Sequence, residues 1–274
     1  MTLPTPTPPA AAASRGAAGH VSPIAAVAGD ATSVRRPHTN VIWRTVRLHA
    51  VNPSVFFGVP WLILGGAWAI TMILGLIMRG AGAPADIEGM RYSWAVLSPQ
   101  WYLVVVGVQA IGLTFPFALG FGATRRDFWL GTALMFVLVS AEMAIAIATL
   151  VQVEILTHGW GLGVHMFDAL WYGESGWLVD FYTTFALQLL VLFIGAGATT
   201  VYMRWRIPGM MVLLFSSIAV VLAAIAVLTF TQGWMAFFAW FASIGIVGGF
   251  TLVLGLAAVC AVGGYLVIRR ATPR

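Results

Sequence analysis

The segment GFGATRRDFWLG, residues 120–131, gathers charged side chains in a chain that has few of them. Thr124 and Asp127 have the Ser/Thr-x-x-Asp/Glu spacing of a capping box, which predicts that a helix begins here. Arg125 and Arg126 then face the positive end of the helix dipole, at a cost of about 0.3–1 kcal/mol each. Attraction to anionic lipid of the inner leaflet stabilises each arginine near the surface by about 1 kcal/mol. The group is therefore either a topology marker between two membrane helices or a docking surface for a protein partner.

Glu142 is the one ionisable residue well inside an apolar stretch. A charge at membrane depth costs about 2.5–3.5 kcal/mol on insertion scales, so such residues usually face a cavity or a partner. Two interpretations stay open, a polar point on a translocation path or a structural side chain that is protonated or hydrogen-bonded. Gln109 and Gln188 lie in other apolar stretches and are the candidate partners of Glu142.

Residues 152–180 carry two histidines and several acids that could in principle hold a metal ion. His158 and His165 are seven positions apart, which fits neither H-E-x-x-H nor another common ligand spacing. We therefore expect Glu154, Asp168 and the histidines to be solvated loop residues, with no metal site. No nucleophile elbow, dinucleotide fingerprint or intramembrane carboxylate pair is present, so we expect no catalytic site, no cofactor and no enzyme activity.

All 14 basic residues are arginine. Without lysine, the chain cannot carry the phosphate-binding P-loop of an ATPase or a Schiff-base lysine. The single cysteine, Cys260, lies in an apolar run, which excludes a disulfide within the chain and a cysteine-based metal cluster.

Composition places the chain in a membrane, because 60% of its residues are hydrophobic and only 8% are charged. We predict an all-α integral membrane protein with six transmembrane helices. The apolar stretches long enough to cross a bilayer are residues 54–78, 96–119, 128–151, 181–201, 208–230 and 235–268.

Arginine placement sets the orientation. With the N-terminus inside, only Arg79 and Arg91 of the arginines between the spans fall on the outer side, as the positive-inside rule requires. We therefore expect both termini in the cytoplasm. The abundance of Ala, Gly and Val and the preference for Arg over Lys are typical of a GC-rich bacterial genome, and we expect the chain in the bacterial cytoplasmic membrane. Topology also explains the basic pI better than nucleic acid does, because the arginines form no patch interleaved with aromatic residues.

Residues 1–38, rich in Pro, Ala, Thr and Ser, predict a disordered cytoplasmic tail ahead of a single membrane domain, residues 39–274. Residues 39–52 predict a short amphipathic helix on the inner leaflet. Arg44 and Arg47 share one face of it, and Trp43, Val46 and Ala50 share another.

The outer segment 152–180 is rich in aromatic residues that suit the headgroup layer, among them Phe167 and Tyr172. We expect VHMFDALWYG, residues 164–173, to form a short interfacial or re-entrant helix.

The stretch FPFALGFGATRRDFWLGT, residues 115–132, resembles the segment between the second and third helices of bacterial, often actinobacterial, ABC-2-type transporter permeases. The layout is also similar: an amphipathic first helix, six spans, both termini inside and no nucleotide-binding domain. The resemblance implies a separate ATPase subunit and a second permease subunit, in a homodimer or a heterodimer. It implies that the inner loop docks in the ATPase as a coupling helix, formed or framed by Gly122, Thr124, Arg125, Arg126, Asp127 and Phe128.

The resemblance thus favours the membrane subunit of an ABC exporter. The scarcity of buried charge favours an amphipathic or lipophilic substrate, such as a drug, peptide or lipid, over a small ion. The alternative is a six-span protein without an ATPase partner: a secondary carrier, a channel or a structural membrane factor.

Overall fold

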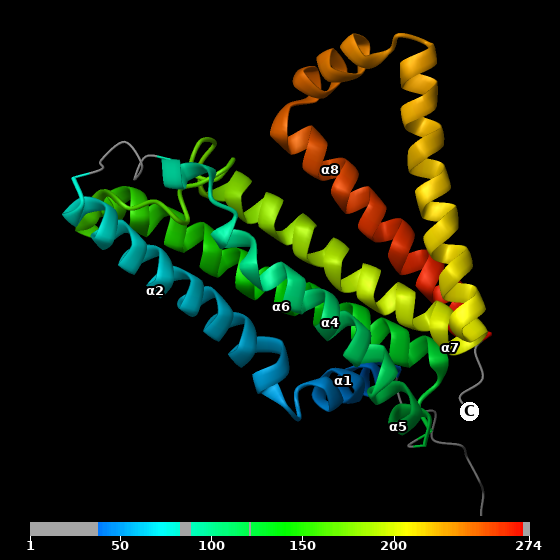
Figure 1. The fold of residues 1–274 in the computed structure, drawn as a ribbon. Helices are drawn as coiled ribbons and strands as arrows, with labels where there is room; N and C mark the ends of the chain where they lie inside the picture. Colours follow the sequence, from blue (N-terminus) through cyan, green and yellow to red (C-terminus); the bar gives the residue numbers. More distant parts are fainter. Residues whose placement is uncertain (1–37, 83–88, 121, 271–274) are drawn as a thin grey trace, which may run out of the picture. The chain divides into compact units, whose positions relative to one another are not determined.

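The structure is a computed structural model that describes residues 38–82, 89–120 and 122–270. These belong to one compact unit, Pro37–Arg274, and the expected tail over residues 1–38 lies outside them except for His38. Every regular element among the described residues is helical, with no strand (Figure 1). The all-α expectation is therefore confirmed for this part of the chain.

Five helical stretches are long and apolar enough to cross a membrane, which makes the chain a multi-span helical membrane protein. They are Ser54–Gly80, Met90–Gly120, Arg125–Leu156, Trp177–Phe230 and Trp234–Ile268. The main helices within and beside them are α1 (His38–His49), α2 (Val59–Gly80), α4 (Ser98–Gly112), α5 (Thr114–Gly120), α6 (Arg125–Leu156), α7 (Trp177–Phe230) and α8 (Trp234–Ile268).

Helix α7 contains both the fourth and the fifth expected spans, which accounts for five stretches where six were expected. It has 54 residues, about 80 Å at 1.5 Å per residue, against a hydrocarbon core of about 30 Å. Its helical geometry is interrupted at Arg206, where φ is 56° and ψ is −145°. The helix changes direction there and forms two arms, the first over 177–205 and the second over 207–230 (Figure 1).

Helix α8 is interrupted in the same way at Gly245, with φ 62° and ψ −172°. This backbone conformation is open essentially only to glycine. The break explains why the sixth apolar stretch is longer than one bilayer crossing, because its first ten residues form a separate short arm.

The second expected span is a single helix only as far as Gly112. Pro116 has no backbone N–H to donate to the Gly112 carbonyl, so the helical ladder is interrupted and a short new helix, α5, begins at Thr114. The expected span over 96–119 is confirmed within Met90–Gly120, and this break divides it between α4 and α5.

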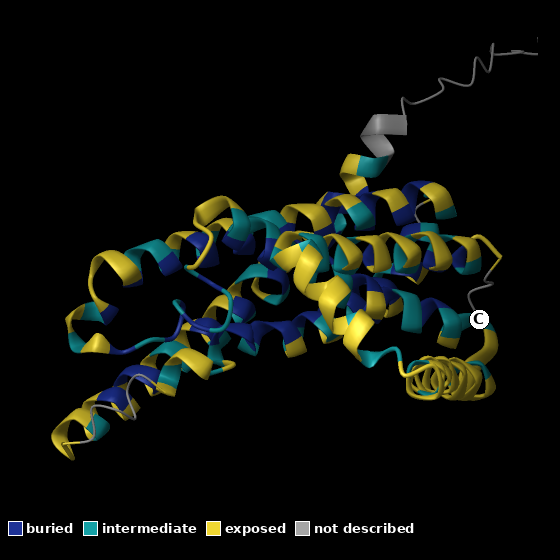
Figure 2. Ribbon diagram, turned by 90° about the horizontal axis from the view of Figure 1, so that it is seen from above, coloured by how far each residue is buried: buried dark blue, intermediate teal, exposed yellow. Residues whose placement is uncertain are grey.

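The first arm of α7 lies at the centre of the helix packing, against α4, α6 and α8. It runs parallel to α4 at very close range, because a methyl group added at Gly107 or Gly195 would overlap a backbone carbonyl of the other helix. It runs antiparallel to α6, with the rings of Phe136 and Phe193 5.3 Å apart. By contrast, almost all residues of the second arm of α7 are exposed (Figure 2).

The amphipathic helix expected near the N-terminus is confirmed as α1. Arg44 and Arg47 are exposed, as expected, and Val46 is buried against the rest of the protein. Trp43 and Ala50, expected on the same face as Val46, are exposed instead. Part of the expected apolar face is therefore left free for lipid rather than packed in the protein core.

Candidate functional site

The start of α6 is capped as the sequence predicted. Thr124 has extended backbone geometry, and its Oγ1 accepts a hydrogen bond of 3.1 Å from the backbone N–H of Asp127. The hydroxyl group of Thr124 in turn donates to Oδ2 of Asp127 over 2.7 Å. This reciprocal pair gives the first turn of α6 a defined geometry at the end of the inner loop.

The two arginines of the first turn have different surroundings. Arg125 donates from its guanidinium to the backbone carbonyl of Arg269 over 2.9 Å, at the C-terminal end of α8. A cation at that position satisfies a carbonyl that α8 itself leaves unpaired and complements the helix dipole. Arg126 is exposed on the adjacent face of α6. Arg125 thus bonds the N-terminal end of α6 to the C-terminal end of α8, whereas the side chain of Arg126 is exposed.

The six residues expected in the coupling loop do not all face outward. Gly122, with φ 77°, is exposed together with Thr124 and Arg126, whereas Asp127 and Phe128 are buried. Phe128 packs its ring 5.2 Å from that of Phe115 in α5. Its ring anchors the start of α6 in the core.

Helix α1 also holds the start of α6, through a buried polar contact that the sequence did not suggest. His49 lies 3.0 Å from Oγ1 of Thr132 through its Nε2, and Thr132 itself donates to the carbonyl of Phe128 over 3.0 Å. Because the Thr132 proton is used there, Nε2 of His49 carries the proton and Nδ1 is a buried atom with no partner. Burial lowers the pKa of His49 to about 4, since a second proton would place a charge in this dry site.

Glu142 is not joined to either glutamine that the sequence offered as a partner. Its Oε1 accepts a hydrogen bond of 2.8 Å from the indole N–H of Trp61 in α2. Gln109 is half-buried, and Gln188 is fully buried with both amide atoms unpartnered. The three residues therefore do not form one hydrogen-bonded group.

Gln100 of α4 occupies the position relative to Gly107 that Gln188 of α7 occupies relative to Gly195, and sequence reasoning missed it. Gln100 precedes Gly107 by seven residues (107 − 100), and Gln188 precedes Gly195 by seven (195 − 188), on the contacting faces of two parallel helices. Both amides are buried and unpartnered, and so is the hydroxyl of Ser140 in α6. The signal available in the sequence was the shared glycine-to-glutamine spacing of the two stretches.

Glu154, expected to be a solvated loop acid, is fully buried at the end of α6. Its Oε1 accepts hydrogen bonds of 2.8–3.0 Å from the backbone N–H groups of Met166, Phe167 and Asp168. Its Oε2 accepts another, of 2.7 Å, from the indole of Trp160. A buried carboxyl group that accepts hydrogen bonds from four N–H groups fixes the loop around it.

The same hydrogen bonds explain why residues 164–173 form no helix. Three consecutive backbone N–H groups point at one carboxylate, so they cannot point along a helix axis toward carbonyl groups. Phe167 and Tyr172 are buried within the protein in this loop, and burial raises the pKa of Tyr172 to about 12. The expected interfacial helix is therefore wrong.

Two arginines also contact the loop between α6 and α7. Asp168 lies 3.1 Å from Arg91 and 3.4 Å from His165, and Arg79 donates to the carbonyl of Leu162 over 3.1 Å. Within the described ranges, no group of three or more histidine, cysteine or acidic residues is arranged to hold a metal ion. Arg79 at the end of α2 and Arg91 before α4 thus bind this loop to the rest of the protein.

Comparisons with protein-family models, with curated proteins and with solved structures found no match.

Proposed function

We propose that this chain is the membrane subunit of an ABC exporter that moves an amphipathic or lipophilic substrate, with ATP hydrolysed by a separate subunit. The observation that carries the proposal is the capped start of α6, with Thr124 and Arg126 exposed and Arg125 bonded to the end of α8. This arrangement presents a rigid charged surface at the end of a membrane helix, which a partner can bind and move.

Helix directions support the six-pass arrangement that the proposal needs. The first arm of α7 runs parallel to α8, since Tyr182 hydrogen-bonds Thr251 over 2.9 Å and Gly197 lies near Cys260 further along both helices. A chain that leaves one helix and enters a parallel one must first cross back. The second arm of α7 is the apolar segment between them, and it makes that crossing in the proposed topology.

Force applied at the inner loop would reach three other elements through contacts of α6. Arg125 connects it to α8, the His49–Thr132 contact connects it to α1, and the ring of Phe128 connects it to α5. Movement of the inner end of α6 by an ATPase would therefore move these helices together. This is the mechanical step we propose for coupling.

A second permease subunit completes the proposed transporter. Residues 207–244 are apolar and almost wholly exposed, so their surface is available for lipid or for another membrane subunit. The preference for an uncharged or amphipathic substrate rests on the middle of the spans, where Glu142 accepts a hydrogen bond from Trp61 and the buried polar side chains of Ser140 and Gln188 are neutral.

The test is to establish whether an ABC ATPase is encoded beside this chain, to co-express the two, and to measure ATP turnover after reconstitution. We expect the pair to co-purify and Arg126→Glu to lower ATP turnover about tenfold or more, because like charges at an interface cost several kcal/mol. Arg47→Glu, an equally exposed arginine on α1, is the matched control and should retain most of the activity.

If the wild-type chain binds no ATPase, the exporter proposal fails and the six-span protein without an ATPase partner takes its place. If Arg126→Glu and Arg47→Glu reduce turnover equally, the effect is one of surface charge and the α6 start is not the coupling surface.

A further inference from the structure

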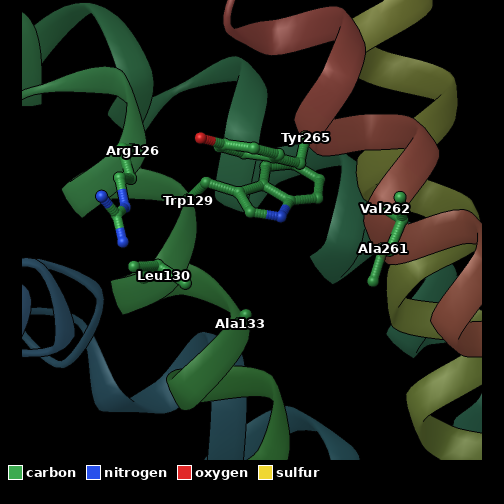
Figure 3. Close-up of a pocket in the computed structure, with 7 residues that line it drawn as sticks. All are labelled: Arg126, Trp129, Leu130, Ala133, Ala261, Val262 and Tyr265. Carbon is green, nitrogen blue, oxygen red and sulfur yellow. The ribbon is translucent and has the colours of Figure 1, made fainter.

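A pocket of ≈ 430 Å³ lies between α6 and α8 at their inner ends (Figure 3). Its α6 wall consists of Arg126, Trp129, Leu130 and Ala133, which share one helix face because they are spaced three and four apart. Its α8 wall consists of Ala261, Val262 and Tyr265. None of the α6 residues except Arg126 was singled out by the sequence.

The pocket has one charged group and an otherwise apolar lining. Arg126 is exposed and makes no hydrogen bond or ion pair with any residue that the structure describes. Asp127, the acid beside it in the chain, is buried and bonded to Thr124. The guanidinium group at the mouth is therefore available to an anion from outside the chain.

The apolar part extends from the guanidinium level into the membrane. Arg126 and Ala133 are seven residues apart on α6, which corresponds to about 10 Å along the helix axis. Trp129 is buried and its ring lies against Gly264 of α8, so it forms the floor between the two helices. A ligand that fits this shape has an anionic end at the membrane surface and a chain that continues toward the bilayer centre.

We propose that this pocket binds one anionic glycerophospholipid of the inner leaflet. Arg126 takes the phosphate by paired N–H···O bonds, and the proximal part of an acyl chain lies along Leu130, Ala133 and Val262. Basic pockets between helix ends at the cytoplasmic surface suit such headgroups. The inference requires that α6 and α8 end at the inner surface, and it does not require an ATPase partner.

The site also lies where a bound lipid would affect the fold. Arg125 joins the same two helix ends through the Arg269 carbonyl, so a lipid wedged between α6 and α8 acts across a contact that already exists. The lipid would add an apolar and ionic link between the helices, in a position that the polypeptide leaves open.

The experiment is native mass spectrometry of the full chain in detergent, with added phosphatidylglycerol or phosphatidylcholine at matched chain length. We expect phosphatidylglycerol to bind the wild type more tightly. Arg126→Gln should weaken its binding by about fivefold, which corresponds to the roughly 1 kcal/mol gained per arginine near an anionic surface. Ala261→Phe, which fills the apolar part, should weaken both lipids. Arg47→Gln, an exposed arginine outside the pocket, should change neither.

Three results would overturn the proposal. Equal binding of the two lipids by the wild type removes the anionic preference. An equal effect of Arg47→Gln and Arg126→Gln indicates a diffuse surface charge. Displacement of phosphatidylglycerol by glycerol phosphate at similar concentration indicates that the acyl chain of the lipid contributes nothing to binding. The site is then one for free phosphate esters.

Discussion

At the scale of single residues, the surroundings of a polar side chain decide its exposure and its hydrogen-bond partners. Glu142 and Glu154 lie twelve positions apart on one helix, yet one is half-exposed and bonded to a tryptophan and the other is buried among four N–H donors. His49 similarly sits as a neutral donor between two helices. The same residue type therefore has different roles at these positions.

Replacing Glu154 by glutamine should destabilise the outer loop. Glu154→Gln replaces one acceptor oxygen by an NH₂ group that faces N–H donors, with an expected loss on the order of 2 kcal/mol. Glu142→Gln is the matched control in the same helix and should cost little, because its side chain is half-exposed and Oε2 has no partner. The measurement is unfolding in mixed micelles by SDS titration, and equal losses in the two variants would contradict the assigned role of Glu154.

The His49 contact should weaken as pH falls. Its pKa is about 4 in the folded chain against 6.5 for the free side chain, so below pH 6.5 the unfolded chain takes up the proton first. The contribution is therefore complete above pH 6.5 and declines by about 1.4 kcal/mol per pH unit toward pH 4. His49→Phe should remove this slope from unfolding curves recorded between pH 7 and 4. A variant that keeps the wild-type slope would assign the pH dependence to other groups.

At the scale of elements, backbone breaks decide where the apolar stretches turn. Pro116 and Gly245 each interrupt a stretch that hydropathy alone treats as continuous, whereas Arg206 lies in the expected gap between residues 181–201 and 208–230. Proline acts by removing a donor, whereas the other two act through a positive φ.

Gly245→Ala should be destabilising without any steric clash. No atom lies within 4 Å of a Cβ built at Gly245, so the expected cost of about 1–3 kcal/mol comes from the backbone conformation alone. Gly249→Ala, four residues later in equally open space and without a positive φ, should be neutral or slightly stabilising. Thermal unfolding in detergent compares the two variants, and equal midpoints would mean that the break at Gly245 is absent in the protein.

At the scale of the whole molecule, the two arms of α7 decide the number of membrane crossings. Helix α7 changes direction at Arg206, and the chain after it is apolar and exposed for more than twenty residues. Six crossings, with both termini on the same side of the membrane, follow if the second arm spans the bilayer.

Single cysteines test that crossing. In a Cys260→Ser background, Ile207→Cys and Thr231→Cys mark the two ends of the second arm. A membrane-impermeant maleimide should label position 231 from outside and position 207 only from inside. Thr157→Cys, at the outer end of α6, serves as the reference for the outer side. Labelling of positions 207 and 231 from the same side would show that the second arm of α7 does not cross the membrane.

Local physical chemistry allowed several features to be predicted from the sequence. The capping box needs only Thr124 and Asp127 at a fixed separation, so it was predictable and is confirmed. The membrane class follows from composition, and the amphipathic α1 follows from residues within one turn of each other. In each case the interacting groups are close in the chain, and their spacing carries the information.

Only the tertiary structure decided the surroundings of the remaining residues. Glu154 meets N–H groups twelve to fourteen positions away, Arg125 meets a carbonyl at the far end of the chain, and Phe128 turns inward against α5. Hydropathy and spacing contain no term for such contacts, because they depend on which helix faces meet. The sequence by itself determined that this chain crosses a membrane and where α6 begins, and packing decided which of its polar groups are buried, paired or free to bind.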